Sequence, residues 1–219
     1  MWKTTSLDIQ VQIILSNCIA TTENLGRVSE TGIDVELADR LRELFLVRQF
    51  QRGNAEAFTA LVRRYERRLL YFLKRFERDP ERAVDVLQDV WMAAWSSRMS
   101  LRSADAFRPW IYRIAHGKIV DSIRDEMRRH RTEQVRQCNS SITGNGPDAV
   151  FEIAELVHFA LSQVTPERRE VLTLRFLEAM STAEISEVTN LPIGTVKSRL
   201  HYASKEVMSI IREQENVNK

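Results

Sequence analysis

A short stretch near the C-terminal end of the chain, PIGTVKSRL beginning at Pro192, gathers side chains that can bind a polyanion. It contains Thr195, Lys197, Ser198 and Arg199. Lysine and arginine donate charge-assisted hydrogen bonds to phosphate oxygens, and serine and threonine hydroxyls can bond to base edges. Two alternatives follow: the stretch belongs to a hairpin packed for stability, or to a helix that lies in a DNA groove.

Helical periodicity separates the side chains of this stretch into two faces. At about 100° per residue, the apolar face comprises Val196, Leu200, Ala203 and Val207. The opposite face comprises Thr195, Ser198, Tyr202 and Lys205, with Lys197 and Arg199 on its flanks. Most of the polar groups lie in the first half of the helix, which is the half that a recognition helix directs at base edges and phosphates.

A second, shorter helix is predicted directly before the turn Asn190-Leu191-Pro192. Ser181 and Glu184 have the spacing of a capping box, in which each side chain bonds to the backbone N–H of the other residue. The two segments form a helix-turn-helix or, alternatively, an αα-hairpin that only stabilises a bundle. Small and basic outward-facing groups favour DNA binding, because long or acidic residues there would obstruct the phosphates.

A second basic surface is predicted on a long helix over residues 107–130. Ile111, Ala115, Ile119 and Ile123 recur at every fourth position and form its apolar side, with Trp110 expected in the core. The charged residues on and around the other side include Arg113, His116, Lys118 and Arg124. The polar, irregular loop 96–106 precedes this helix and is a candidate functional surface. The alternative is an arginine-rich helix that is merely solvated.

The helix predicted from Pro80 combines two kinds of surface. Val84, Leu87, Trp91 and Ala94 are expected to be buried. The opposite stripe comprises Asp85, Gln88, Asp89, Met92 and Ser96. An exposed methionine among acids and an amide is typical of a contact with another protein, although a plain solvated face is the alternative.

Composition and periodicity predict an all-α protein of two small helical domains joined by a flexible linker, the second ending in the helix-turn-helix. The 219 residues include only 7 Gly and 5 Pro. The predicted segments are a 1–36 extension of unknown role, a 37–130 helical domain, a 131–150 linker, a 151–214 helical domain and a 215–219 tail. In the first domain, one face of the first helix holds Leu37, Leu41, Leu44 and Phe45, and a second helix covers about 55–76.

Several classes of protein are disfavoured by what the chain lacks. No apolar run approaches the roughly 20 residues that span a bilayer, and no signal peptide is predicted. The two cysteines, Cys18 and Cys138, are too few for a disulfide framework, which predicts a cytoplasmic protein. The histidines have no metal-ligand spacing, and no glycine loop for phosphate is present, so we expect no metal, no cofactor and no enzyme. A DNA-cleaving enzyme would need a nucleophile, and the candidate Tyr65 is expected in the core.

These segments together resemble one family. PIGTVKSRLHYA, with the preceding LTLRFLEAMSTAEISEVTNLP, is similar to region four of bacterial RNA polymerase sigma factors of the extracytoplasmic-function (ECF) group. VDVLQDVWMAAW resembles region 2.2 of that group, and FRPWIYRIAHGKIVDSIRDEMRR resembles regions 2.3 and 2.4. The similar segments cover roughly residues 40–130 and 151–212, in the order that the family has.

The resemblance implies a function and a set of contacts. In a sigma factor, the −35 promoter element would be bound by Thr195, Lys197, Ser198, Arg199 and Tyr202. The −10 region would be bound by Arg98, Arg102, Arg113, His116, Lys118 and Arg124. Core polymerase would be bound by Asp85, Gln88, Asp89 and Met92. The candidates for capture of a flipped −10 base are Ser97, Arg98, Ser100, Arg102 and Ser103.

The implied partners are core RNA polymerase, through its β′ clamp helices and β flap, promoter DNA and an anti-sigma protein. The alternative function is a stand-alone helix-turn-helix regulator, which binds DNA without polymerase and usually reads a palindrome as a symmetric dimer. One chain with two unlike DNA-facing units favours a bipartite, asymmetric promoter.

Overall fold

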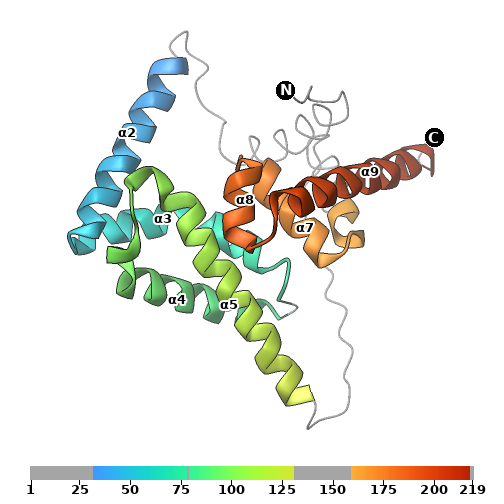
Figure 1. Cartoon of the computed structure of the whole chain (residues 1–219), viewed down its shortest axis with the longest axis horizontal. Helices are drawn as coiled ribbons and strands as arrows, with labels where there is room; N and C mark the ends of the chain where they lie inside the picture. The colour runs from blue at the N-terminus through green and yellow to red at the C-terminus, as the bar shows by residue number, and fades with distance from the viewer. Residues whose placement is uncertain (1–31, 78, 131–158, 218–219) are drawn as a thin grey trace. The chain divides into compact units, whose positions relative to one another are not determined.

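The structure, a computed structural model, describes residues 32–77, 79–130 and 159–217 (Figure 1). These residues fall into two compact units, which we describe separately. Every regular element in the described ranges is helical, which confirms the predicted all-α class. The predicted linker 131–150 and residues 1–31 of the predicted extension lie outside the described residues.

Four helices and two short 3₁₀ turns build the first unit. The elements are α2 (Gly32–Gln51), α3 (Ala55–Leu73), α4 (Pro80–Ser96), η1 (Arg98–Ser100), η2 (Ala104–Ala106) and α5 (Phe107–His130). Helix α2 begins at Gly32, before the predicted Leu37, and α3 ends at Leu73, before the predicted Phe76. The bounds of α5 are those predicted.

Local capping residues explain where α3 and α4 begin. Asn54 Oδ1 accepts a hydrogen bond from the backbone N–H of Ala57 at 2.8 Å. Asp79 Oδ1 accepts one from Glu81 at 2.9 Å, and Pro80 occupies the first helical position as predicted. Gly53, between α2 and α3, has φ +85°, a conformation that side chains with a Cβ rarely adopt.

Aromatic rings fill the core of the first unit. Phe50 of α2 stacks on Phe58 of α3 with ring centroids 5.6 Å apart, and it contacts Phe107 of α5 edge-on at 6.0 Å. Trp110 is buried, which confirms its expected place in the core. Tyr65 is only 1% exposed and packs edge-on against Phe107, so it is a core residue, as predicted, and is not accessible as a nucleophile.

A network of polar side chains joins α2 to α3. Arg64 donates to both carboxylate oxygens of Asp39 and, through Nε, to Glu43 Oε2 at 2.8 Å. The Tyr65 hydroxyl donates to Glu43 Oε1 at 2.7 Å. The hydrogen bond from Arg64 lowers the pKa of Asp39 below its ordinary value. Burial, together with the neighbouring Glu43 carboxylate, raises the pKa of Tyr65.

One prediction of burial in this unit is wrong. Val84 is 40% exposed, because the buried stripe of α4 is centred on Ala83, Leu87 and Val90, and Val84 lies at its rim. The predicted apolar face of α2 is also largely exposed, at Leu37, Leu41 and Phe45. Helix α2 buries Val47 and Phe50 instead, and Figure 1 shows its N-terminal half extending beyond the other helices of the unit.

The second unit is a set of short helices packed against one long helix. Residues 159–163 are helical, and the following elements are α7 (Pro166–Leu172), the π-helical turn η3 (Thr173–Leu177), α8 (Thr182–Thr189) and α9 (Ile193–Val217). Helix α9 therefore continues into residues predicted as a tail. Pro166 occupies the first position of α7, and the side chain of Thr165, which precedes it, makes no capping hydrogen bond.

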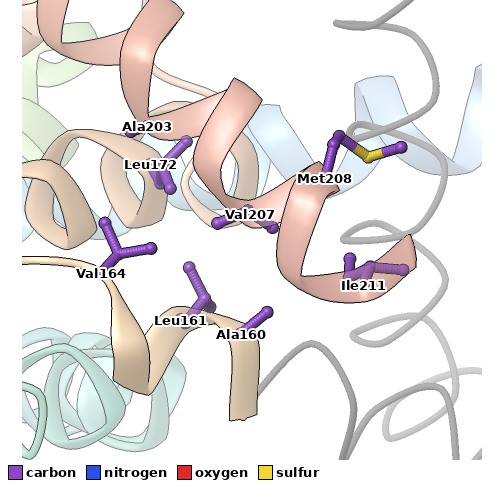
Figure 2. Packing of buried hydrophobic residues seen from close by; sticks show 8 residues of the cluster. All are labelled: Ala160, Leu161, Val164, Leu172, Ala203, Val207, Met208 and Ile211. Carbon is purple, nitrogen blue, oxygen red and sulfur yellow. The ribbon is translucent and has the colours of Figure 1, made fainter. Parts of the chain in front are cut away.

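Aliphatic side chains form the core of this unit, as Figure 2 shows. Its members are Ala160, Leu161, Val164, Leu172, Ala203, Val207, Met208 and Ile211. Ala203 and Val207 are on the face of α9 that periodicity predicts to be apolar. Their burial turns the opposite face of α9 outward, because a helix that packs along one stripe exposes the other.

Candidate nucleic-acid and protein interfaces

The junction between α8 and α9 has the local structure of a helix-turn-helix. The predicted capping box at the start of α8 is present: Glu184 N–H donates to Ser181 Oγ at 3.2 Å, and Ser181 N–H donates to Glu184 Oε2 at 2.8 Å. Asn190 ends α8 with φ 54°, and Ser186 Oγ donates to the Leu191 carbonyl at 2.5 Å. These bonds define the turn and therefore the angle at which α9 leaves it.

The outward face of α9 carries the predicted −35 residues. Lys197, Ser198 and Tyr202 are exposed, whereas Thr195 and Arg199 are half-buried at the margins. The structure thus brings all five predicted residues onto the first half of one helix. His201 is also exposed, with its ring 5.5 Å from that of Tyr202, and sequence analysis missed it. Its angle of about 140° from Val196 would have placed it on this face by periodicity alone.

The loop between α4 and α5 separates its polar residues into two groups. Ser97, Arg98 and Ser100 make hydrogen bonds within the unit. Arg102 and Ser103 are exposed, and between them and the first group Leu101 is buried. Met99 of this loop is 78% exposed, and it was not predicted because the loop candidates were all polar.

The predicted basic residues of α5 do not share one face. Arg113 and Arg124 are exposed on the same side of the helix, with the exposed Gly117 between them. His116 and Lys118 are half-buried on opposite flanks of that side. The exposed basic surface of α5 therefore comprises fewer residues than the sequence predicts.

The polar stripe of α4 borders an open groove against α5. Asp85, Gln88 and Asp89 are exposed, and Met92 on the same side is 61% exposed. The groove has a volume of about 780 Å³ and is lined by Arg82, Asp85, Val86, Gln88, Asp89, Lys118, Asp121, Ser122, Arg124 and Asp125. Lys118 and Arg124, predicted to contact DNA, therefore line the same groove as three of the four residues predicted to contact polymerase.

A partly buried ion pair supports one end of this groove. Arg82 donates through Nη2 to Ser122 Oγ at 2.9 Å, which links α4 to α5. Arg82 Nε also lies 3.8 Å from the buried carboxylate of Glu77. Within the described residues, no group of three or more histidine, cysteine, aspartate or glutamate side chains could hold a metal ion.

None of the helices that the structure describes combines the length and the apolar character needed to cross a membrane.

Comparison with known proteins identifies the family. The pattern of Sigma-70 region 2 matches residues 61–129, and that of Sigma-70, region 4 matches residues 154–207. The RNA polymerase sigma-H factor of Pseudomonas aeruginosa is 30% identical over 183 residues, which cover 77% of this chain and 95% of that protein. The ECF RNA polymerase sigma-E factor of Escherichia coli (strain K12) is 26% identical over 182 residues, covering 78% and 95%. This chain belongs to the ECF sigma factor family.

Two solved structures have the same fold. The sigma factor RpoE of Bartonella quintana, in complex with the anti-sigma factor NepR, matches with a TM-score of 0.60 at 18% identity and covers 72% of this chain and 98% of that one. CnrH, in complex with the cytosolic domain of CnrY, matches with a TM-score of 0.54 at 23% identity and covers 78% and 98%.

The candidate surfaces of this sigma factor lie in two different matched regions. Region 2 extends from within α3 almost to the end of α5, so it contains the polar stripe of α4, the loop and the basic side of α5. Region 4 contains α7, α8 and the first half of α9, including the outward face described above. Helix α2 precedes the region 2 match, although it packs against α3 of that region.

Proposed function

We propose that this sigma factor binds core RNA polymerase, recognises a −35 and a −10 promoter element, and promotes promoter melting. It is an initiation factor and not an enzyme, as its family membership shows. The observation that carries the proposal is the pairing, in one chain, of a helix-turn-helix with an outward basic face and a second helical unit with a separate polar loop. Two unlike DNA-facing surfaces suit an asymmetric promoter.

The −35 contacts are assigned to the outward face of α9. Thr195, Ser198 and Tyr202 offer hydroxyl groups for base edges, and Lys197 and Arg199 offer cations for phosphates or acceptor-rich bases. Helix α8 supports this geometry because its capped start and its αL end hold the turn in one conformation. A hairpin that only stabilised the unit would not need to expose these groups together.

The polymerase contact is assigned to Asp85, Gln88, Asp89 and Met92 on α4. Exposed Met92 gives this surface an apolar centre beside acids and an amide, which is the composition of a protein interface. Arg113 and Arg124 on α5 are assigned to DNA near the −10 element, with His116 and Lys118 at the edges of that contact. Arg124 and Lys118 also border the α4 groove, so polymerase and DNA would bind side by side on region 2.

An anti-sigma protein and a cytoplasmic location belong to the same proposal. Of the two solved structures with the same fold, RpoE is in complex with an anti-sigma factor, and CnrH is in complex with the cytosolic domain of CnrY. A cytoplasmic location follows from the proposed partners, since core polymerase and promoter DNA are both there. Each DNA-binding surface is small, so the protein alone should bind DNA weakly, and polymerase would raise the joint affinity by holding both surfaces in place.

Run-off transcription tests this proposal. Purified core polymerase is incubated with promoter fragments from the protein's own genome, with and without the sigma factor. We expect discrete transcripts only when the sigma factor is present, and their start sites should align to reveal two elements. The absence of such transcripts, together with tight binding of the protein alone to a palindrome, would instead establish a stand-alone regulator.

A further inference from the structure

The first part of the α4–α5 loop is held by hydrogen bonds within region 2. Ser97 Oγ donates to the Ala93 carbonyl at 2.6 Å, and Arg98 Nη1 donates to the Trp95 carbonyl at 3.0 Å. The Arg98 guanidinium also lies over the Trp95 ring, 5.0 Å from its centroid. These groups serve the end of α4, so they are not available to read a base.

Two side chains from other helices hold the middle of the loop. Trp110 Nε1 of α5 donates to Ser100 Oγ at 3.2 Å. Gln51 Nε2, at the end of α2, donates to the Leu101 carbonyl at 2.7 Å, and the Leu101 side chain is buried. Gln51 precedes Leu101 by 50 positions in sequence. The backbone at Ser100–Leu101 is therefore attached on both sides.

The two residues after Leu101 have side chains that face the solvent. Arg102 and Ser103 are exposed, and Ser103 has an extended backbone with φ −147° and ψ 154°. In the described part of the chain, the Arg102 guanidinium makes no hydrogen bond or ion pair. Met99, on the η1 turn before them, exposes an apolar thioether. The exposed residues therefore offer the planar guanidinium of Arg102 and the hydroxyl of Ser103 for hydrogen bonds, and the apolar side chain of Met99 for contact with the face of an unstacked base.

We propose that Arg102, assisted by Ser103, selects the unpaired base of the −10 element, and that Gln51 of α2 is a positioning residue for this selection. The assignment rests on the proposed function and narrows it, since it chooses among the polar loop residues. Gln51 acts through the Leu101 carbonyl, because that bond determines where the following peptide and the Arg102 side chain begin.

The chemistry of the guanidinium predicts which bases are preferred. A bidentate guanidinium contact needs two adjacent acceptors on one edge of the base. Guanine has O6 and N7, and an unpaired cytosine has O2 and N3. Adenine and thymine have a donor or a methyl group beside each such acceptor. We therefore expect guanine or cytosine at the unpaired position, and Lys in place of Arg102 should not preserve the preference, because an ammonium is a point donor.

The test is run-off transcription by the full-length sigma factor with core polymerase on four templates that differ only in this base. Arg102→Ala and Arg102→Lys should reduce the ratio of output from the preferred template to that from the adenine template about 10- to 100-fold. Gln51→Met should reduce it about fivefold, with an unchanged dependence on the −35 sequence. Gln49→Ala, at another half-buried glutamine of α2, is the matched control and should leave the ratio unchanged.

Amide hydrogen exchange across residues 98–106 of the full chain gives the second readout. Gln51→Met should increase exchange at this loop, and Gln49→Ala should not. A merely structural role for Gln51 would reduce output from all four templates equally and leave their ratio intact, and this result would remove Gln51 from the assignment.

The possible failures are distinguishable. If the wild-type protein transcribes a promoter and Arg102→Ala retains the base ratio, the assignment of Arg102 is wrong while the proposed function stands. If no wild-type template is transcribed with core polymerase, the proposed function is wrong and the assignment falls with it. Because Arg102 is exposed, its replacement should not affect folding, so a lost ratio reports on recognition.

Discussion

Replacing Glu43 by alanine removes the acceptor of the buried Tyr65 hydroxyl and one of the two carboxylates that face Arg64. A buried hydroxyl without a partner costs about 1–3 kcal/mol. The Arg64–Glu43 pair is partly exposed, with side-chain exposures of 32% and 23%, so solvent screening limits its contribution to roughly 0.5–1 kcal/mol. The variant should therefore lower the free energy of unfolding of the first unit by about 1.5–4 kcal/mol.

Tryptophan fluorescence measures this unit selectively within the full chain. Three of the four tryptophans, Trp91, Trp95 and Trp110, lie in the first unit, and residues 159–217 contain none. Trp2 lies outside the described residues, so Trp2→Phe is the background for every variant. Urea titration followed at the tryptophan emission then reports the stability difference. In a thermal scan, the same loss should lower the melting temperature by about 6–30 °C for a unit of this size.

A double-mutant cycle with Tyr65→Phe isolates the buried hydrogen bond. In the Tyr65→Phe background, Glu43→Ala leaves no hydroxyl without an acceptor and should cost only the ion pair, about 0.5–1 kcal/mol. The coupling energy should therefore be about 1–3 kcal/mol. Equal costs of Glu43→Ala in the two backgrounds would refute the reasoning, because they would show that the hydroxyl gains nothing from this carboxylate.

Further expectations follow from single positions. Gly117→Ala should raise the free energy of unfolding by about 0.5–1 kcal/mol in the same titration, because alanine favours the helix more than glycine and its Cβ would meet no heavy atom within 4 Å. A decrease would contradict the absence of a steric conflict at this position. The pKa of Tyr65 is raised in the folded protein, so its contribution to stability is complete below about pH 10, the ordinary pKa of tyrosine, and is lost as the pH rises further. Tyr65→Phe should therefore reduce the loss of stability between pH 9 and pH 11.5. An unchanged loss would exclude ionisation of Tyr65 as its cause. Met92→Ala should weaken binding to core polymerase about fivefold or more, measured by competition with the wild-type protein, and full binding would remove α4 from that interface. Arg199→Ala should reduce output from the cognate promoter, and unchanged reporter output would show that this side chain does not contribute to −35 recognition.

Much of the secondary structure could be predicted because its signals are local. The start of α4 at Asp79-Pro80 and the capping box of α8 depend on residues within one helical turn of each other. The outward face of α9 follows from the period of 3.6 residues, which also predicts the burial of Val196 and Ala203. These features need no partner from elsewhere in the chain.

The structure differs from the sequence-based predictions where packing between distant segments decides which side chains are buried and which lie together. Periodicity shows that Leu41 and Phe45 share a face of α2, but not that this face is exposed while Val47 and Phe50, nearer the C-terminal end of α2, are buried. The same limit applies to Lys118 and Asp89, which belong to separately predicted sets and meet in one groove only because α4 and α5 pack side by side.

The sequence by itself determined the all-α class, the helix-turn-helix and the family, because helix periodicity, caps and motif spacing are properties of neighbouring residues. Only the tertiary structure decided which polar residues of the 97–106 loop are used internally and which remain outward. Their partners come from remote segments: Gln51 and Trp110 reach the loop from α2 and α5. A hydrogen bond between distant residues depends on how the helices pack, so composition could not distinguish Ser100, which accepts a bond from Trp110 of α5, from Ser103, which is left outward.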